Sequence, residues 1–375
     1  MHVITAQNVN DAYRKGLTLM SDFGIPTASR NGPVLRVAAP VTTVYEFPTE
    51  RVLFSPQRDA NPFFHLFEAL WMLDGNNDTA FFDTILPTFK SFSDDGVTFH
   101  GAYGYRWRHW PLDGLDVDTR EIDQLAVAIA MLKKDPTSRR VVIGMWDPAR
   151  DLNADSKDIP CNDLIKVNIV NGALDLTVLC RSNDMVWGAY GANAVHFTIL
   201  QEYLAAMVGF PIGRFYQISA DYHAYVEKPY KWSTYYPSYE IGHVDHYSDN
   251  SASKVFPLVA NTATFDQELH SVVMAIREGN LRTHDPAAYS NPFFVFVVMP
   301  MFQAFEYYKR SGPIMAHDYL ADTLLNDDPT DWLVAAREWL YRRAFKERTL
   351  FVAGGRQQGK AQALRDLSQG SMEDS

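Results

Sequence analysis

The sequence predicts an α/β fold in which a mixed sheet is flanked by helices and followed by a helical C-terminal extension. Three observations lead to this prediction. Alternating apolar and polar residues on both sides of Asn171-Gly172 are typical of a β-hairpin with a type I′ turn. Apolar residues at helical spacing occur on both sides of that hairpin, for example between Asn61 and Gly75. Beyond about residue 230 the patterns are mainly helical, and we expect helices near 264–279, 294–311 and 329–347.

The bulk composition excludes several classes of protein. The chain has 375 residues, of which 47% are apolar, so it can bury a substantial core. A formal net charge of −11 argues against broad electrostatic binding of DNA or of an anionic membrane, because that binding needs a basic face. Two cysteines are too few for a disulfide framework or a metal-ligand set. Neither a signal peptide nor a membrane span is visible, so we expect a cytoplasmic protein without a metal.

The sequence of the N-terminal part predicts a helix, then a loop that carries an arginine, and then a second, buried helix. The first helix should end at a turn formed by Ile25-Pro26. Arg30 then lies on a glycine-containing loop that precedes a segment of alternating apolar and polar residues. On such a loop, the arginine side chain and the backbone N–H groups can bind an anion together. A solvated turn arginine is the alternative. The helix from Asn61 to Gly75 carries Glu68 on its apolar face, and a buried carboxylate is costly unless it is paired or used.

The middle of the chain adds aromatic residues and a pair of arginines. The aromatic, glycine-rich residues 100–111 predict a pocket wall or a packed loop rather than a regular element. An amphipathic helix should follow over residues 121–134. Arg139 and Arg140 stand at the start of the next predicted strand, where their side chains would point to opposite faces. At most one of them would then serve a site within its own subunit.

The predicted hairpin brings a cysteine and an arginine together. Cys161 precedes its first strand and Arg181 follows its second, so antiparallel pairing places both at the same end. A thiol near a cation is a plausible nucleophile, because the cation favours the thiolate. A buried, inert cysteine is the alternative. Further on, Asp221, His223 and Tyr225 alternate along a strand predicted over residues 213–227 and so share one face, which suggests a site or a satisfied polar ladder.

Taken in order, these motifs resemble the thymidylate synthase family, including its phage branch of pyrimidine-nucleotide hydroxymethylases. The resemblance covers roughly residues 20–230, in the family's order and close to its spacing. It is carried by the segments SRNG, FEALWMLDG, YGYRWRHW, DPTSRRVVIGMWDP, PCN, CRSNDMVWG and DYHAY, together with Asn193.

The resemblance implies a role for each matching residue. Cys161 would add to C6 of the pyrimidine, and Glu68, Tyr103 and Asp184 would assist the chemistry. 5,10-Methylenetetrahydrofolate would supply the carbon at C5, beside Asp184, Trp187 and Gly188. Loss of tetrahydrofolate would then leave an exocyclic methylene, which hydride converts to a methyl and water to a hydroxymethyl. The nucleotide would be bound by Arg30, Arg139, Arg140, Arg181, Ser182, Asn193, His223 and Tyr225.

The chain departs from the family pattern at several points. Asn162 follows the cysteine, where synthases usually carry histidine. The segment GAYGAN is one residue longer than the usual GLPFN, so aligning Asn193 with the base-reading asparagine assumes a small insertion. The short apolar C-terminus of the synthases is absent, and only Phe89 or Phe92 stands near the place of the tryptophan that shields the methylene. These departures favour access of water.

The expected activity follows from the resemblance and from Asn193. An amide offers a donor and an acceptor, which matches uracil, whereas cytosine prefers a carboxylate that can be protonated. We therefore expect dUMP to be converted to 5-hydroxymethyl-dUMP. Thymidylate synthesis and modification of dCMP remain open, as does a nucleotide- or RNA-binding regulator without turnover.

The extent of the resemblance and the change of sequence character after about residue 226 suggest an organisation for the chain. Residues 1–230 would form the catalytic domain, residues 231–355 a helical extension and residues 356–375 a flexible tail. In this family an arginine pair is donated across a dimer interface, which implies a homodimer in which Arg139 and Arg140 serve the partner's site.

Overall fold

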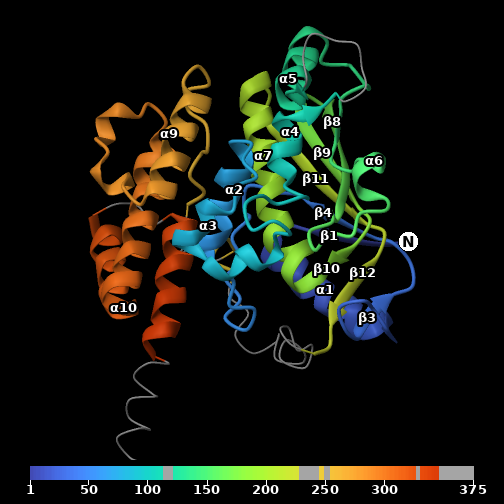
Figure 1. Cartoon of the computed structure of the whole chain (residues 1–375), viewed down its shortest axis with the longest axis horizontal. Helices are drawn as coiled ribbons and strands as arrows, with labels where there is room; N and C mark the ends of the chain where they lie inside the picture. The colour runs from blue at the N-terminus through green and yellow to red at the C-terminus, as the bar shows by residue number, and fades with distance from the viewer. Residues whose placement is uncertain (113–120, 228–244, 249–253, 327–329, 346–375) are drawn as a thin grey trace, which may run out of the picture.

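A computed structural model describes residues 1–112, 121–227, 245–248, 254–326 and 330–345. The fold is a mixed α/β arrangement in which helices cover one side of a large sheet, as the sequence predicts (Figure 1). The expected tail, residues 356–375, lies outside the described residues. No helix in the described ranges combines the length and apolarity that crossing a bilayer requires.

The main sheet has six strands in the order β1-β4-β11-β9-β8-β7. The hairpin β8–β9 is confirmed, and both turn residues, Asn171 and Gly172, have positive φ, as a type I′ turn requires. β11 pairs in parallel with β9 and antiparallel with β4, so the sheet is mixed. Its strands are β1 (His2–Ala6), β4 (Val41–Tyr45), β7 (Val142–Gly144), β8 (Asn162–Val170), β9 (Ala173–Cys180) and β11 (Ile212–Ser219).

A second sheet of four strands lies beside the first, in the order β10-β12-β3-β2. The strand predicted over residues 213–227 is in fact two strands, because the chain leaves the main sheet after Ser219 and enters the second sheet at Tyr222. Ile25 and Pro26 lie in an edge strand of this sheet rather than in the expected turn. The strands are β2 (Gly24–Thr27), β3 (Val34–Val37), β10 (Asn183–Asp184) and β12 (Tyr222–Tyr225), and a separate short pair is formed by β5 (Trp110–Pro111) and β6 (Glu121–Ile122).

The helices of the first 230 residues follow the predicted pattern with two corrections. Asn61 caps the buried helix α2, accepting hydrogen bonds from the N–H groups of Phe63 and Phe64. The segment expected to be irregular around 100–111 contains a helix, and a π-helix precedes Asn193. The bounds are α1 (Val9–Phe23), α2 (Pro62–Leu73), α3 (Ala80–Ile85), η1 (Pro87–Phe92), α4 (Tyr103–Arg108), α5 (Gln124–Lys134), α6 (Pro148–Asp151), η2 (Met185–Ala192) and α7 (Asn193–Val208).

The C-terminal helices pack on α2 and share its hydrophobic core. Phe63 and Phe67 of α2 contact Phe302, Phe305 and Trp339 edge-on or tilted. The buried helix α2 therefore has protein on two sides, α7 on one and the C-terminal helices on the other (Figure 1). These elements are α9 (Phe265–Glu278), η4 (Leu281–Thr283), η5 (Pro286–Ala288), η6 (Phe294–Val298), α10 (Met299–Asn326, kinked at Gly312) and a helix over residues 331–345. The division at residue 230 stays a prediction.

Candidate active site

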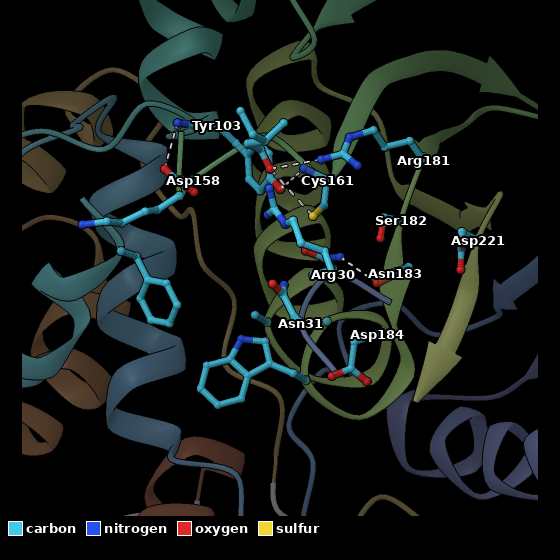
Figure 2. A pocket seen from close by; sticks show the side chains of 18 of the residues that line it. Arg30, Asn31, Tyr103, Asp158, Cys161, Arg181, Ser182, Asn183, Asp184 and Asp221 are labelled. Carbon is cyan, nitrogen blue, oxygen red and sulfur yellow. Dashed lines mark hydrogen bonds between the residues drawn. The ribbon is translucent and has the colours of Figure 1, made fainter. Parts of the chain in front are cut away.

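A cavity of about 760 Å³ opens where the two sheets and α2 meet (Figure 2). Segments far apart in the sequence contribute to its wall: the loop before β3, helices α2 and α4, the loop before β8, the start of α7 and strand β12. Twelve of the fourteen predicted site residues line it, namely Arg30, Glu68, Tyr103, Cys161, Arg181, Ser182, Asp184, Trp187, Gly188, Asn193, His223 and Tyr225.

The hairpin places Cys161 and Arg181 together, as its register predicts. The backbone N–H of Arg181 donates to the carbonyl of Cys161 at 3.0 Å. The guanidinium of Arg181 donates to the carbonyls of Pro160 at 2.8 Å and Ile159 at 3.3 Å. The hydroxyl of Tyr103 accepts from the backbone N–H of Cys161 at 3.0 Å. The loop that carries the thiol is therefore fixed by backbone contacts from two sides.

Burial and charge act on the Cys161 thiol in opposite directions. Removal from water raises its pKa, and the nearby carboxylates of Asp158 and Asp163 add to that rise. The charges of Arg181 and Arg30 lower the pKa but do not reverse the effect of burial. The neighbouring arginine thus lowers the pKa of the thiol, as expected, but its effect is smaller than that of burial. The net effect is a pKa above the ordinary value of a thiol.

Glu68 forms a buried pair that the sequence analysis did not anticipate. Its Oε2 lies 2.9 Å from Nε2 of His196, which stands one turn after Asn193 on α7. Both side chains line the cavity. The other ring nitrogen, Nδ1, is buried and has no hydrogen-bond partner among the described residues. The pair can hold and pass a proton at the cavity wall.

Asn193 belongs to a chain of side-chain amides at the cavity wall. Its Nδ2 donates to Oδ1 of Asn183 at 3.1 Å, and its Oδ1 accepts from Nδ2 of Asn162 at 3.4 Å. The chain continues from Asn183 to Ser219 at 2.9 Å, and Oδ1 of Asn162 accepts from the Cys180 thiol at 2.7 Å. Neighbours on both sides thus fix the orientation of the Asn193 amide, which keeps one N–H and one lone pair available.

The side of the cavity near β12 combines cations with a histidine. Nδ1 of His223 lies 3.2 Å from Asp221, and the same carboxylate forms an ion pair with Arg36 at 3.0 Å. All three side chains line the cavity together with Tyr225 and the exposed Arg30. The three residues expected to share one face, Asp221, His223 and Tyr225, therefore all line the cavity, although Asp221 lies just outside the strand.

Strand β10, which pairs with β12, adds a half-buried carboxylate, and aromatic rings lie near it. Oδ1 of Asp184 accepts from the N–H of Val186 at 2.9 Å, and burial raises the pKa of this carboxyl. Trp187 stands beside it, and the guanidinium of Arg58 lies 5.6 Å from the centre of the Trp187 ring. Phe89 and Phe92, the two candidates for a shielding aromatic, line the cavity as well. A flat, partly charged co-substrate fits this wall.

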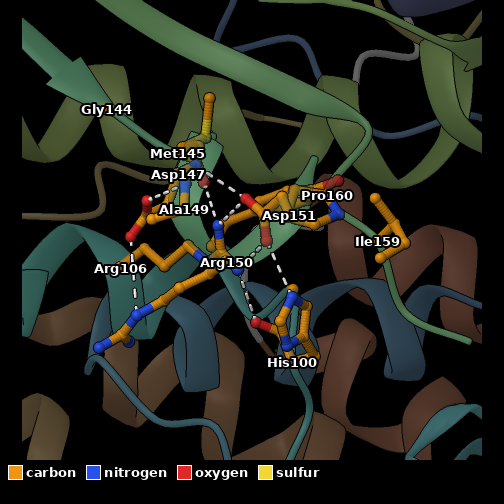
Figure 3. Close-up of polar contacts among 12 residues, drawn as sticks. His100, Arg106, Gly144, Met145, Asp147, Ala149, Arg150, Asp151, Ile159 and Pro160 are labelled. Carbon is orange, nitrogen blue, oxygen red and sulfur yellow. Dashed lines mark hydrogen bonds and ion pairs between the residues drawn. The ribbon is translucent and has the colours of Figure 1, made fainter. Parts of the chain in front are cut away.

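A charged cluster fixes the wall between α4 and Cys161 (Figure 3). The carboxylate of Asp151 accepts from both terminal nitrogens of Arg106, at 2.6 and 2.8 Å, and pairs with His100 at 2.8 Å. Arg106 also donates to the carbonyls of Met145 and His100. These contacts are all internal, so the cluster is structural.

Arg139 and Arg140 are the two predicted site residues that the structure does not bring to the cavity. Both are exposed and stand before β7, away from the lining residues. Conversely, Asn183, His196 and Asp158 line the cavity although the sequence analysis assigned them no role. Asn183 lay inside a quoted motif, whereas nothing in the local pattern pointed to His196. Among the described residues no cluster of histidine, cysteine and carboxylate side chains could hold a metal ion.

Comparison with known proteins gives consistent results. Residues 57–250 match the family model for thymidylate synthase. A deoxyuridylate hydroxymethyltransferase from Pseudomonas phage M6 is 42% identical over 356 residues, which are 93% of this chain and 97% of that protein. Proteins of the same name from Bacillus phage SP01 and Delftia phage PhiW-14 are 35% and 33% identical. These matches cover 60% and 48% of this chain and 60% and 50% of those proteins.

Proposed function

Because the chain belongs to the thymidylate synthase family, we propose that it transfers a one-carbon unit from 5,10-methylenetetrahydrofolate to C5 of dUMP, giving 5-hydroxymethyl-dUMP. The observation that carries the choice of reaction is the phage relative named deoxyuridylate hydroxymethyltransferase, which matches this chain along nearly its whole length. The contents of the cavity fit this reaction, since a thiol, an oriented amide and several cations meet in one space.

The residues have different roles according to their position. Cys161 adds to C6 of the ring, which makes C5 a carbon nucleophile. Arg30, Arg181 and Ser182 bind the phosphate, and His223 and Tyr225 contact the ribose. Asp184, Trp187 and Gly188 stand at the folate side, and Glu68 with His196 handles protons.

Uracil is favoured by the amide of Asn193. Uracil presents N3–H as a donor and O4 as an acceptor, so it matches a side chain that keeps one lone pair and one N–H available. Cytosine presents the opposite pattern. Because Asn162 and Asn183 hold the amide from both sides, turning it over to suit cytosine would break two hydrogen bonds.

The experiment is an incubation with methylenetetrahydrofolate and either dUMP or dCMP, each tritiated at C5, with the products identified by mass. We expect tritium release from dUMP, a product heavier by the elements of formaldehyde, and tetrahydrofolate. A product heavier by a methylene, together with dihydrofolate, would identify a thymidylate synthase. Release from dCMP alone would contradict the assignment of Asn193.

We also propose that the active unit is a homodimer in which Arg139 and Arg140 serve the partner's cavity. Two observations support this. Both arginines are exposed and remote from the cavity of their own chain. Along β9 the buried residues alternate with half-buried ones, such as Asp175 and Thr177. Among the described residues, most of the helices lie on the other face of the main sheet (Figure 1).

Mixing two inactive variants tests the shared site. Cys161→Ala and a double variant, Arg139→Ala with Arg140→Ala, should each be inactive alone. After the subunits exchange, a mixed dimer has one complete site, so activity should return to about a quarter of the wild-type value, the statistical share expected for random pairing of dimers. No recovery despite proven exchange would show that the arginines do not act across the interface.

A further inference from the structure

Two carboxylates line the same stretch of cavity wall near Cys161, and they differ in how many partners they have. Asp151 accepts hydrogen bonds from Arg106 and from the N–H of Asp147 and pairs with His100, so its acceptor positions are filled (Figure 3). Asp158 accepts a single hydrogen bond among the described residues, from the N–H of Gly101 to its Oδ2 at 2.8 Å. Its Oδ1 accepts no hydrogen bond from the described residues, and the residue lines the cavity.

Neighbouring residues fix the position of Asp158. A Cβ at residue 101 would lie 2.8 Å from the carbonyl oxygen of Asp158 and 3.2 Å from its Oδ1, so only glycine allows this approach. Gly101 is itself held by the ion pairs of its neighbour His100 and of Arg106 with Asp151. Ser156 accepts from the N–H of Asp158 at 3.1 Å. The carboxylate therefore has a fixed place.

Asp158 stands three residues before the nucleophile. The negative charge of Asp158 raises the pKa of both the Cys161 thiol and the Tyr103 hydroxyl, so it acts on the two groups that flank the reacting ring. Burial in turn raises the pKa of Asp158, which makes it a stronger base than an exposed carboxylate. In the view of Figure 2, Cys161 lies between Asp158 and Arg181.

We propose that Asp158 is the general base that activates water for attack on the exocyclic methylene, and so directs the reaction to the hydroxymethyl product. This inference rests on the proposed function. It assigns to one carboxylate the step at which a hydroxymethyltransferase and a thymidylate synthase diverge.

The step balances without an oxidant or a reductant. The water oxygen bonds to the methylene carbon while one of its O–H bonds breaks, and the proton goes to the Asp158 carboxylate. The electron pair of the exocyclic double bond moves onto O4 of the ring as an enolate. The enolate then re-forms the C4 carbonyl and the C5–C6 double bond, expelling the Cys161 thiolate from C6. Asp158 returns its proton to solvent.

The test measures how the methylene intermediate divides between water and an added thiol. 2-Mercaptoethanol at a fixed concentration competes for the methylene, and the ratio of hydroxymethyl to thioether product is determined by mass. Asp158→Asn should lower this ratio at least tenfold, because general-base catalysis contributes about 10²–10⁴-fold. Tritium release from C5 should persist, since that step precedes the division. Asp158→Glu keeps a carboxylate, so its ratio of hydroxymethyl to thioether product should lie between those of Asp158→Asn and the wild type.

Asp163→Asn is the matched control. Asp163 is two residues after Cys161 and its carboxylate also raises the pKa of the thiol, but it does not line the cavity. We expect this variant to leave the ratio unchanged. Asp158→Ala with added formate provides a second measurement, in which the ratio should rise with formate concentration.

Three outcomes would overturn the inference. An unchanged ratio in Asp158→Asn would mean that the carboxylate does not activate water. Loss of tritium release in proportion to loss of hydroxymethyl product would mean that Asp158 acts before the methylene forms. A wild-type enzyme that makes the methyl product would overturn the proposed function itself, and it would be recognised without any variant.

Discussion

Two regions of the molecule bury carboxylates, and they do so differently. In the cavity, the half-buried carboxylates of Asp158 and Asp184 accept few hydrogen bonds from the described residues. At the contact between the first 230 residues and the C-terminal helices, Glu202 pairs with Arg51 and accepts from the N–H of Leu258 at 2.8 Å. The first region leaves groups available for a substrate, whereas the second uses them to join two parts of the chain.

The second region is called the joint below, and it consists of Arg51, Glu202, Tyr247, Leu258 and Asp331. The Tyr247 hydroxyl donates to Asp331 at 2.8 Å and accepts from the N–H of Val52 at 3.1 Å. Burial raises the pKa of Asp331 to about 7. If this division of roles is correct, changes in the cavity should alter the reaction and spare stability, and changes in the joint should do the reverse.

The largest expected effect is that of Cys161→Ala on the reaction. Tritium release should fall at least about a thousandfold, because loss of a nucleophile removes the covalent path. The melting temperature should stay close to that of the wild type. Cys180→Ser keeps a donor for Asn162 and should retain most of the activity. A Cys161→Ala protein with normal biological activity would favour the non-catalytic regulator.

The next largest effect is a loss of stability on changing the joint. Arg51→Met leaves Glu202 buried without its ion-pair partner and should lower the free energy of unfolding by about 3–5 kcal/mol. Urea denaturation measures this loss. Arg214→Met removes an exposed pair with Glu46 and should cost far less stability than Arg51→Met. Equal losses in the two variants would show that the joint is not a special contact.

Asn193→Asp should change the choice of base. A carboxylate that can be protonated suits cytosine, so the ratio of kcat/KM for dUMP to that for dCMP should fall about a hundredfold. Asn31→Asp adds the same charge to the cavity wall outside the chain of amides and should weaken both nucleotides alike. An unchanged ratio in Asn193→Asp would place base recognition elsewhere.

Taken per pH unit, the smallest effect is that of pH on stability. The folded pKa of Asp331, about 7, lies above the unfolded value of about 3.9, so the folded state binds the extra proton between these values. Stability is therefore highest below about pH 4 as far as this group is concerned. It falls by about 1.4 kcal/mol per pH unit until about pH 7. Asp331→Asn should remove this slope and leave kcat unchanged, as thermal unfolding and rate measurements at several pH values can check.

The sequence by itself determined the parts of the site that depend on local pattern and register. Asn171-Gly172 specified the hairpin, and the hairpin brought Cys161 to Arg181 because paired strands have a fixed alignment. The cap at Asn61 and the apolar run behind it specified α2 and the burial of Glu68. The family motifs then supplied the other predicted site residues that line the cavity.

Only the tertiary structure decided what the side chains of distant segments do to one another. No local signal shows that His196 meets Glu68, 128 positions away, or that Asp158 has one partner while Asp151 has several. The break between β11 and β12 was also hidden, since alternation continues through both strands although they belong to different sheets. Periodicity reports which face a residue occupies, whereas partners and pKa shifts depend on what packs against that face.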